Sequence, residues 1–467
     1  MSSQARGGVL LFGIHNTVEW WRHIGDHIGW GQVCVVTDLR GEGDISVVDA
    51  FYANLRRCRR RPDPGFALLS AEQKADVVAR CRTLRWLDPE LAHSMIESMA
   101  RALDGVLDTV APRVIISFPI DRYVKHILKL LAEARGIAYL ELTASVLPSM
   151  SMLLQGGHLV KSNDPVDEDA LERYIAELAS PSFLPTYVPR KSRYTRMRFV
   201  RTLGYFRARA AALKLISFWQ RDTLNLHYLD AQPGLGHKCR WRDIRIVSLC
   251  ERDWRNKVGG FPRGRRVLFG LQLFPEASID YWIQNVELID HENLVVQAAR
   301  SFSEAGFLVV VKDHPLQFGF RQTELIDRLR QLPNTVIVPY EVSANDLVPL
   351  VDVNFTFTGT LGLQAALLGL QSVVTDCYYS NEEDFTVFRA ACEIETLPQR
   401  ICEPDRSMMP LELRQRRIVK HLLQGSFVGD FFSFKGFKSD AEAAVRADQM
   451  GAALGVRLQE LSDQGLI

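Results

Sequence analysis

The feature that most constrains the fold is an alternation of short apolar runs with longer segments of helical periodicity. Residues 122–135 carry apolar side chains at helical spacing between the strand-like runs 114–118 and 137–142, and Gly136 follows where a glycine ends a helix. Strand, helix and strand in this order predict a parallel βαβ unit. The predicted strands of the N-terminal half are 9–14, 32–37, 114–118 and 137–142.

A second block of the same kind begins near Arg266. It predicts another doubly wound domain, so the expected fold class is α/β with two Rossmann-like domains facing a cleft. Ligands of such an architecture bind in the cleft. The predicted strands are 267–271, 307–312, 334–338, 351–357 and 371–375, and the predicted helical segments are 285–305, 323–332 and 361–368.

The length of 467 residues suits two domains of about 150 to 200 residues each. We expect a first domain over 1–185, a basic and aromatic helical linker over 186–260, a second domain over 261–440 and a C-terminal helix over 441–467. The acidic run that starts at Asp167 is expected to begin a helix rather than to hold a metal ion.

The linker contains a strongly basic segment, because residues 190–221 carry ten Lys and Arg and no Asp or Glu. Aromatic residues lie between the bases, so a helix here can rest on an anionic bilayer with its rings inserted. A linker helix that packs its rings on a domain explains the composition equally well. RNA binding is a weaker alternative, since no RNA-binding motif accompanies the segment and the net charge is only +1. No nucleic-acid partner is expected.

Cysteine usage and hydropathy bear on the cellular compartment. The eight cysteines form no CxxC pair, which predicts reduced and mostly buried thiols rather than disulfides or a zinc site. The apolar run 7–13 is too short for a signal peptide, and no apolar stretch approaches the roughly 20 residues that span a bilayer. We therefore expect a cytoplasmic protein that at most binds peripherally to the inner face of the cytoplasmic membrane.

The first candidate site follows the predicted strand 307–312. That strand ends in Lys312, Asp313 and His314, and Pro315 prevents its continuation. The carboxyl edge of a parallel sheet is where ligands bind, so Lys312 and a protonated His314 can stabilise phosphate charge there. Arg321 can add a bidentate phosphate contact. The simpler alternative is a loop histidine that caps a neighbouring backbone group.

The second candidate site is the turn of Thr358, Gly359 and Thr360 between a predicted strand and a predicted helix. The first turn of a helix presents free N–H groups to an anion, and the threonines add hydroxyl donors. The alternative is that Thr360 caps the helix and the glycines serve close packing. A third strand end, at 270–278, brings Glu276 and Ser278, which either line the cleft or cap the next helix, and Gln272 of the same segment is a further candidate for the donor site.

Two carboxylates of the N-terminal half follow predicted strands. Glu19 comes after the first strand and Asp121 after the strand 114–118. Either can serve as the base or nucleophile of a group transfer, or be an acid at the start of a helix. The motifs GxGxxG, GxxxxGK[ST], HExxH and GxSxG are absent, which argues against dinucleotide dehydrogenases, P-loop enzymes, zinc proteases and α/β-hydrolases.

The order and spacing of four segments resemble motifs of the capsule polysaccharide biosynthesis family. Residues 312–318, KDHPLQF, resemble its KEHPxQF run, and residues 332–336, LPNTV, resemble its LPNV run. Residues 356–369 resemble its TxTGTxGxEAxxxGxP run, and residues 271–278 its LQxxPEAS segment. Residues 116–147 resemble its acceptor-side segment more loosely.

The resemblance implies a GT-B glycosyltransferase of capsule or cell-surface polysaccharide synthesis, with a metal-independent donor site and no cofactor. The chain is also similar to β-Kdo transferases and bacterial sialyltransferases, whose His-Pro motif contacts the donor phosphate. His314 and Pro315 would be that motif, and residues 358–360 would bind the nucleotide phosphate or ribose. The implied partners are a nucleotide sugar, by preference CMP-activated such as CMP-Kdo, and a glycan or glycolipid acceptor at the N-terminal domain.

The chain departs from the family pattern at two places. Gln364 stands where the family has Glu, and Pro119-Ile120-Asp121 stands where the family has PHE. A glutamine can still bond a ribose hydroxyl, without the strength that a charge adds. These departures either retune the choice of donor or mark a degenerate domain that only binds nucleotide or polysaccharide. An alditol-phosphate transferase and a sugar-nucleotide epimerase are further alternatives of the same fold.

Overall fold

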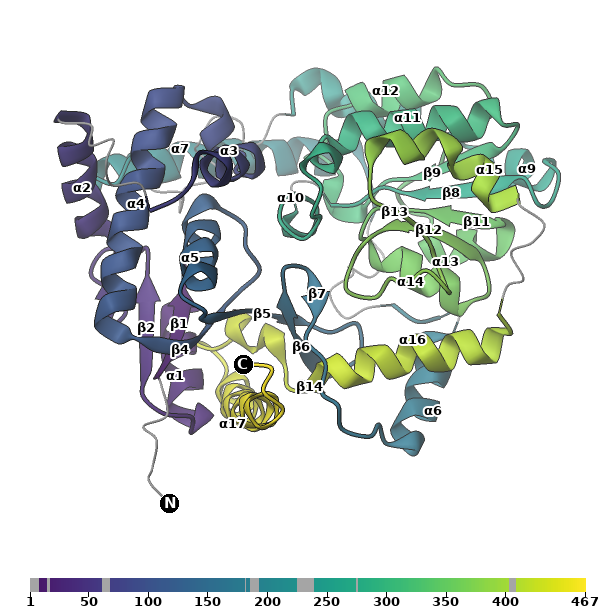
Figure 1. Ribbon diagram of the computed structural model, residues 1–467. Helices are drawn as coiled ribbons and strands as arrows, with labels where there is room; N and C mark the ends of the chain where they lie inside the picture. Colours follow the sequence, from purple (N-terminus) through teal and green to yellow (C-terminus); the bar gives the residue numbers. More distant parts are fainter. Residues whose placement is uncertain are drawn as a thin grey trace. The chain divides into compact units, whose positions relative to one another are not determined.

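The computed structural model describes residues 8–14, 17–60, 68–180, 182–184, 193–224, 239–273, 276–402 and 409–467. The chain forms two compact units, each built from several stretches (Figure 1). Unit 1 comprises Met1–Pro165, Lys214–Leu235 and Leu423–Ile467, and unit 2 comprises Val166–Leu213 and Gly236–Leu422. Two of the boundaries fall within helices, one in α7 (Arg196–Trp219) and one in α16 (Leu411–Gly425). The expected segmentation at 185, 260 and 440 stays a prediction, because compactness does not establish which segments fold alone.

Unit 1 contains a mixed sheet in the order β14-β6-β5-β4-β1-β2-β3, with β7 paired to β6. Strands β1 to β5 are parallel, and β6 and β14 run antiparallel to their neighbours. The chain moves outward from β1 to β3 and returns to β4 on the other side, so the order reverses between β1 and β4. The strands are β1 (Gly8–Gly13), β2 (Val33–Thr37), β3 (Ile45–Ser46), β4 (Pro112–Ser117), β5 (Ala138–Ala144), β6 (Met150–Gln155), β7 (His158–Leu159) and β14 (Ser426–Val428).

Capping residues mark the start of helix α4 and the end of helix α5 in unit 1. Helix α4 starts at Pro89, after Asp88 accepts hydrogen bonds from the next two free N–H groups. Helix α5 matches the segment predicted over 122–135, and Gly136 follows it with φ +68°. The helices are α1 (Val18–Ile28), α2 (Val48–Arg60), α3 (Ala71–Arg80), α4 (Pro89–Val110), α5 (Tyr123–Ala134) and α17 (Ala441–Asp463), with short 3-10 turns at Leu84–Trp86 and Phe431–Lys435.

Unit 2 is built on a six-stranded sheet in which every pairing is parallel. Its order, β10-β9-β8-β11-β12-β13, is the Rossmann order 3-2-1-4-5-6. The sequence of strands therefore reverses between β8 and β11. The fold class of two doubly wound, Rossmann-like α/β units is confirmed, with an all-parallel sheet in unit 2 and a mixed sheet in unit 1. The strands are β8 (Arg266–Gly270), β9 (Leu308–Lys312), β10 (Thr335–Ile337), β11 (Val353–Phe355), β12 (Gln371–Thr375) and β13 (Thr386–Phe388).

The helices of unit 2 include one correction. The single helical segment expected over 285–305 is wrong, because a 3-10 turn at Val286–Ile289 precedes α11 and Asp290 between them has ψ 50°. The expected helix start at Asp167 is confirmed, since its carboxylate caps Ala170 N–H at 3.1 Å. The helices are α6 (Glu168–Leu178), α8 (Ile246–Leu249), α9 (Trp254–Gly259), α10 (Ala277–Asp280), α11 (His291–Glu304), α12 (Glu324–Arg330), α13 (Ala344–Leu347), α14 (Thr360–Leu367) and α15 (Leu397–Cys402), with further 3-10 turns at Trp241–Arg245, Pro315–Gln317, Val348–Leu350 and Ala391–Thr396.

Helix α7 carries the basic and aromatic segment, and its two ends differ. Phe199 is fully buried in the core of unit 2, and the preceding Tyr194 ring lies 5.1 Å from that of Phe318. Phe218 and Trp219 at the other end are 75% and 84% exposed. The first part therefore packs its rings on a domain, while the last turns present theirs to solvent. Arg190 and Lys191 lie outside the described residues.

The structure bears on two further expectations, that the cysteines are mostly buried free thiols and that no helix spans a membrane. All eight cysteines lie in the described part of the chain and are free thiols. Cys81, Cys239 and Cys377 are buried as expected, but the expectation is wrong for Cys392 and Cys402, which are exposed. Among the described helices, none combines the length and the apolar character needed to cross a bilayer.

Candidate functional site

Three neighbouring strands of unit 2 end at one edge of its sheet. Strand β8 is hydrogen-bonded to β9 on one side and to β11 on the other, with Phe269 in register with Val311 and Phe355. Parallel strands in register deliver the residues that follow them to the same edge. Gln272, His314 and Thr358, predicted as site residues from three separate motifs, each follow one of these strands.

Gln272 and Thr358 are joined by two hydrogen bonds where the strand order reverses. The Gln272 amide nitrogen donates to the Thr358 hydroxyl at 2.8 Å, and its carbonyl oxygen accepts from the Thr358 N–H at 2.9 Å. The side chains are 6% and 4% exposed, so these bonds replace contacts with water. Glu276 lies beside them, with a carboxylate oxygen 3.5 Å from the same amide nitrogen; it is the N-cap residue of α10, but its side chain makes no capping hydrogen bond.

Arg321 holds the ends of β8 and β9 together from a buried position. It donates to the Gln272 backbone carbonyl at 2.7 Å, to the Asp313 carboxylate at 3.1 Å and to the Glu292 carboxylate at 3.1 Å. Asp313 also accepts from the Tyr340 hydroxyl. These bonds use three of its five N–H groups and the residue is only 5% exposed, so its geometry suits a positioning residue.

His314 lies at the start of a short 3-10 turn (Pro315–Gln317). Its Nδ1 accepts a hydrogen bond from Leu316 N–H at 3.2 Å, so in the neutral ring Nε2 carries the hydrogen. Burial lowers the pKa of His314 to about 4, outweighing the opposite effect of Asp313. The imidazole is therefore neutral at pH 7 and can donate one hydrogen bond. A bound phosphate would have to raise its pKa before it could act as a cation.

Lys312 supports this loop from inside the unit. Only 5% of the residue is exposed, and its ammonium group donates to the Asp313 backbone carbonyl at 2.7 Å and lies 5.3 Å from the centre of the Tyr340 ring. Burial lowers its pKa to about 8, against the opposing charge of Asp313. Its charge acts on a ligand at the edge through the protein rather than by contact.

The turn between β11 and α14 leaves a free helix start. Gly359 is the N-cap of α14, so the alternative in which Thr360 caps this helix is wrong, and among the described residues no side chain caps the first turn. A Cβ atom at Gly359 would lie 2.8 Å from the Thr356 hydroxyl, and one at Gly362 2.7 Å from the Tyr379 hydroxyl. Both glycines are therefore required for packing, and the half-buried N-terminal turn keeps free N–H groups that can donate hydrogen bonds to an anion.

Gln364 has partners that explain why it is not a glutamate. Its amide nitrogen donates to the Phe183 carbonyl at 3.1 Å and to the Asn345 side-chain oxygen at 2.9 Å. A carboxylate would meet two acceptors and have no hydrogen to give either. Its amide hydrogens are used within unit 2, so a ribose contact would have to involve the remaining carbonyl oxygen.

The two carboxylates predicted as catalytic lie in unit 1. Asp121 follows β4 and pairs with Arg122 at 3.1 Å and Lys125 at 3.0 Å. Burial would raise the pKa of Asp121, but these two cations outweigh it and hold the pKa below its usual range. Asp121 is thus an anion with weakened basicity. Glu19 lies in the first turn of α1, is largely exposed and pairs with Lys438 at 2.9 Å.

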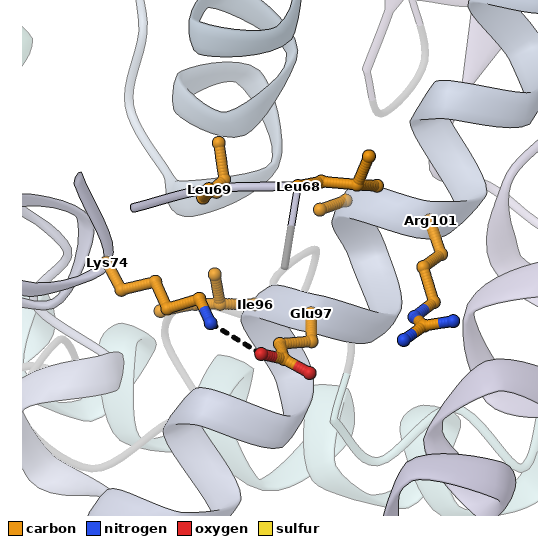
Figure 2. Close-up of a pocket in the computed structure, with 7 residues that line it drawn as sticks. Leu68, Leu69, Lys74, Ile96, Glu97 and Arg101 are labelled. Carbon is orange, nitrogen blue, oxygen red and sulfur yellow. Dashed lines mark hydrogen bonds and ion pairs between the residues drawn. The ribbon is translucent and has the colours of Figure 1, made fainter. Parts of the chain in front are cut away.

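Three residues of the network in unit 2 were missed. Asp313 stood within a recognised motif but was not singled out, although a charge next to a predicted strand end is a usable signal. Tyr340 and Glu292 reach the network from distant segments that carry no motif. A small hollow in unit 1, lined in part by Leu69 and the Lys74–Glu97 ion pair of 2.5 Å, contains none of the predicted site residues (Figure 2).

No protein-family model and no curated protein matches the sequence. Among solved structures, KpsC of Thermosulfurimonas dismutans, a beta Kdo 2,4 transferase, is similar at 13% identity and a TM-score of 0.32, over 68% of this chain and 82% of that one. A UDP-GlcNAc 2-epimerase of Methanocaldococcus jannaschii has 11% identity and a TM-score of 0.27, over 89% and 99%. Os79 of O. sativa, in complex with UDP and deoxynivalenol-3-glucoside, has 12% identity and a TM-score of 0.25, over 98% and 99%. The fold of each unit is assigned from its own strand order.

Proposed function

We propose that this chain is a metal-independent glycosyltransferase that binds a nucleotide-activated sugar at the carboxyl edge of β9, β8 and β11. The observation that carries the proposal is the reversal of strand order between β8 and β11, bridged by Gln272 and Thr358. Open α/β sheets bind their ligands at this kind of position. The resemblance to the capsule polysaccharide biosynthesis family supports the same residues independently.

The phosphates would be held by neutral donors rather than by a cluster of cations. His314 offers Nε2–H, Thr358 and Thr360 offer hydroxyl groups, and the uncapped start of α14 offers backbone N–H groups. Preorganised donors of this kind stabilise the charge that develops on a departing nucleotide. Lys312 and Arg321 are buried, so they would act indirectly, by holding the loops in place and by adding positive electrostatic potential.

The finer assignment rests on the resemblance alone. We propose a CMP-activated donor, such as CMP-Kdo, a glycan or glycolipid acceptor, and a role in capsule or cell-surface polysaccharide synthesis in the cytoplasm. For the base or nucleophile we retain Asp121 and Glu19. Glu19 is an exposed carboxylate paired with Lys438, whereas Asp121 is held anionic by Arg122 and Lys125.

We also propose that the exposed end of α7 contacts an anionic membrane surface, where a glycolipid acceptor would be found. Phe218 and Trp219 are exposed, and α7 carries basic residues and no acid. The double variant Phe218→Ser, Trp219→Ser should lose sedimentation with vesicles containing phosphatidylserine. Equal sedimentation of both proteins with these vesicles, or none with either, would remove this part of the proposal.

Two alternatives are tested together with the main proposal. An epimerase or alditol-phosphate transferase would bind a nucleotide at the same edge but yield a different product. The alternative of a degenerate binding component rested on Gln364, which stands where the family has Glu. The hydrogen bonds that Gln364 makes within unit 2 explain this departure by its local partners, so they weaken that alternative.

The first experiment screens CMP, CDP, UDP and GDP for thermal stabilisation of the protein. A nucleotide at one hundred times its dissociation constant should stabilise the fold by about 2.7 kcal/mol. Product analysis with sugars activated by the stabilising nucleotide then separates transfer, epimerisation and alditol-phosphate transfer. Stabilisation by none of the four nucleotides would overturn the proposed site.

A variant tests the role of His314. His314→Ala should lower turnover by a factor of about 100 or more if the imidazole stabilises the leaving group. His93→Ala, which removes an exposed histidine of α4, is the matched control and should leave turnover unchanged. Full activity of His314→Ala would contradict the role given to this residue.

A further inference from the structure

Two histidines and an aspartate of unit 1 converge where α1 meets α17. His23 and His27 are four residues apart on α1, so both imidazoles leave the same face of the helix. Asp448 faces them from α17, and one ring nitrogen from each histidine and one carboxylate oxygen lie within 4.8 Å of one another. The proposed transferase function makes no use of these residues.

The spacing of this trio is set by close helix packing. A Cβ atom at Gly451 of α17 would lie 2.7 Å from the backbone oxygen of Ile24 in α1. A Cβ atom at Gly455, one turn later, would overlap the carbonyl of Ile28. Because the backbones of α1 and α17 touch at two glycines, the three side chains are held within reach of one another.

The hydrogen bonding of His27 leaves a lone pair directed at the carboxylate. Its Nδ1 lies 2.9 Å from the His23 backbone oxygen, and only an N–H can bond to a carbonyl. In the neutral ring Nε2 therefore carries the lone pair, and it lies 3.7 Å from Asp448 Oδ1. His23 Nε2 contacts the same oxygen. Two acceptors that face each other favour a cation between them, and a histidine whose other nitrogen donates to a backbone carbonyl is typical of metal ligands.

We propose that His23, His27 and Asp448 bind a divalent transition metal of the zinc class. Imidazole nitrogens and a carboxylate oxygen suit Zn²⁺, Co²⁺ and Ni²⁺. Tetrahedral metal–ligand bonds of about 2.0–2.2 Å place the ligand atoms about 3.3 Å apart, so shifts of the ligand atoms by about 1 Å, through side-chain rotation, complete the site. The side chains are 30%, 40% and 41% exposed, so water can fill the remaining position. His27 lies in the last turn of α1, where the negative end of the helix dipole favours a cation.

The ion would link two helices rather than perform the chemistry of a zinc protease. The spacing HxxxH lacks the glutamate of the zinc-protease motif, since Ile24 follows His23. A bound ion would join α17 to α1 and so hold the C-terminal helix on unit 1. The assignment goes beyond the transferase proposal, and failure of every nucleotide to bind would leave it untouched.

The test begins with protein freed of metal by a chelator and then titrated with Zn²⁺. Calorimetry should give one site per chain, and the unfolding temperature of unit 1 should rise by about 5 °C at one hundred times the dissociation constant. Co²⁺ in place of Zn²⁺ should give visible absorption of a nitrogen and oxygen site without a thiolate charge-transfer band. No saturable binding, or a thiolate band, would overturn the proposal.

Variants locate the site. His27→Ala and Asp448→Asn should each weaken Zn²⁺ binding at least tenfold, because each removes one ligand. Asp448→Asn is nearly isosteric, so its fold should persist even if His27→Ala is unstable. His93→Ala should bind Zn²⁺ as the parent does. Unchanged affinity in Asp448→Asn, or loss of stability without any response to metal, would reduce the trio to a histidine–aspartate ion pair.

Discussion

Replacing Arg321 with methionine tests whether one buried guanidinium holds the strand edge of unit 2. Arg321 donates to the Gln272 carbonyl at 2.7 Å and to Asp313 and Glu292 at 3.1 Å each, and its side chain is 3% exposed. Methionine fills most of the same space but removes all three donors. Asp313, itself 3% exposed, then loses its charge partner while remaining buried.

The expected cost follows from the burial of each partner. Breaking a buried ion pair by removing one member costs about 3–5 kcal/mol, because the other charge is left uncompensated. Asp313 keeps hydrogen bonds from the Tyr340 hydroxyl and the His314 N–H, which places the cost at the lower end. The Glu292 side chain is 43% exposed, so the pair it makes adds at most about 1 kcal/mol. We expect Arg321→Met to lower the free energy of unfolding by about 3 kcal/mol.

Urea unfolding measures this cost. Arg328→Met, which removes one hydrogen bond from α12 to Asn293, is the matched control and should cost about 1 kcal/mol or less. The double variant Arg321→Met, Asp313→Asn should be more stable than the sum of the single effects, with a coupling above about 1 kcal/mol. A loss below about 1 kcal/mol for Arg321→Met, or strict additivity, would refute the bracing role.

Three further predictions concern single side chains. The pKa of His314 is lowered to about 4, so as pH falls this histidine binds a proton in the unfolded chain before it does so in the folded protein. The parent should therefore lose about 1–2 kcal/mol more unfolding free energy between pH 7 and pH 5 than His314→Asn does. Parallel pH profiles of the two proteins would contradict this. Gln364→Glu should cost about 1–3 kcal/mol in urea unfolding, because its carboxylate faces two acceptors, and an unchanged midpoint would show that they move apart. Gly362→Ala should lower the unfolding temperature through a cost of about 1–3 kcal/mol, whereas Gly105→Ala, whose Cβ meets open space in α4, should raise it slightly; equal shifts would refute the packing explanation.

Strand ends were the part of the site that the sequence predicted best. Lys312, His314, Gln272 and Thr358 were singled out because each follows an apolar run, and the parallel sheet brings these runs to one edge. Hydrophobic periodicity and β-branched residues are local features of the sequence, so they can be recognised without knowledge of the fold. The strands β1, β2, β4, β5 and β8 to β12 could therefore be read in advance, whereas β3, β6, β7, β13 and β14 were not predicted.

Side-chain roles could not be read in the same way. Arg321 looked like a phosphate ligand and Lys312 like a free cation, yet both are buried and bonded to the protein. Burial and partners depend on residues far along the chain, such as Tyr340, that carry no motif. The histidine pair of α1 was missed because its third ligand, Asp448, is separated from it by more than four hundred residues.

Strand β14 gives unit 1 an unusual order of assembly. Its Ser426 pairs with Met152 of β6, so the ribosome must make residues 153–425, including all of unit 2, before this edge of the first sheet can close. Until then residues 150–152 of β6, which β14 covers, have no strand on the edge away from β5, and chaperones or a second nascent chain have access to this edge. Cutting the gene between the units would leave that edge open permanently, so a fragment meant to isolate the first sheet needs residues 423–467 supplied in trans or spliced on by a linker.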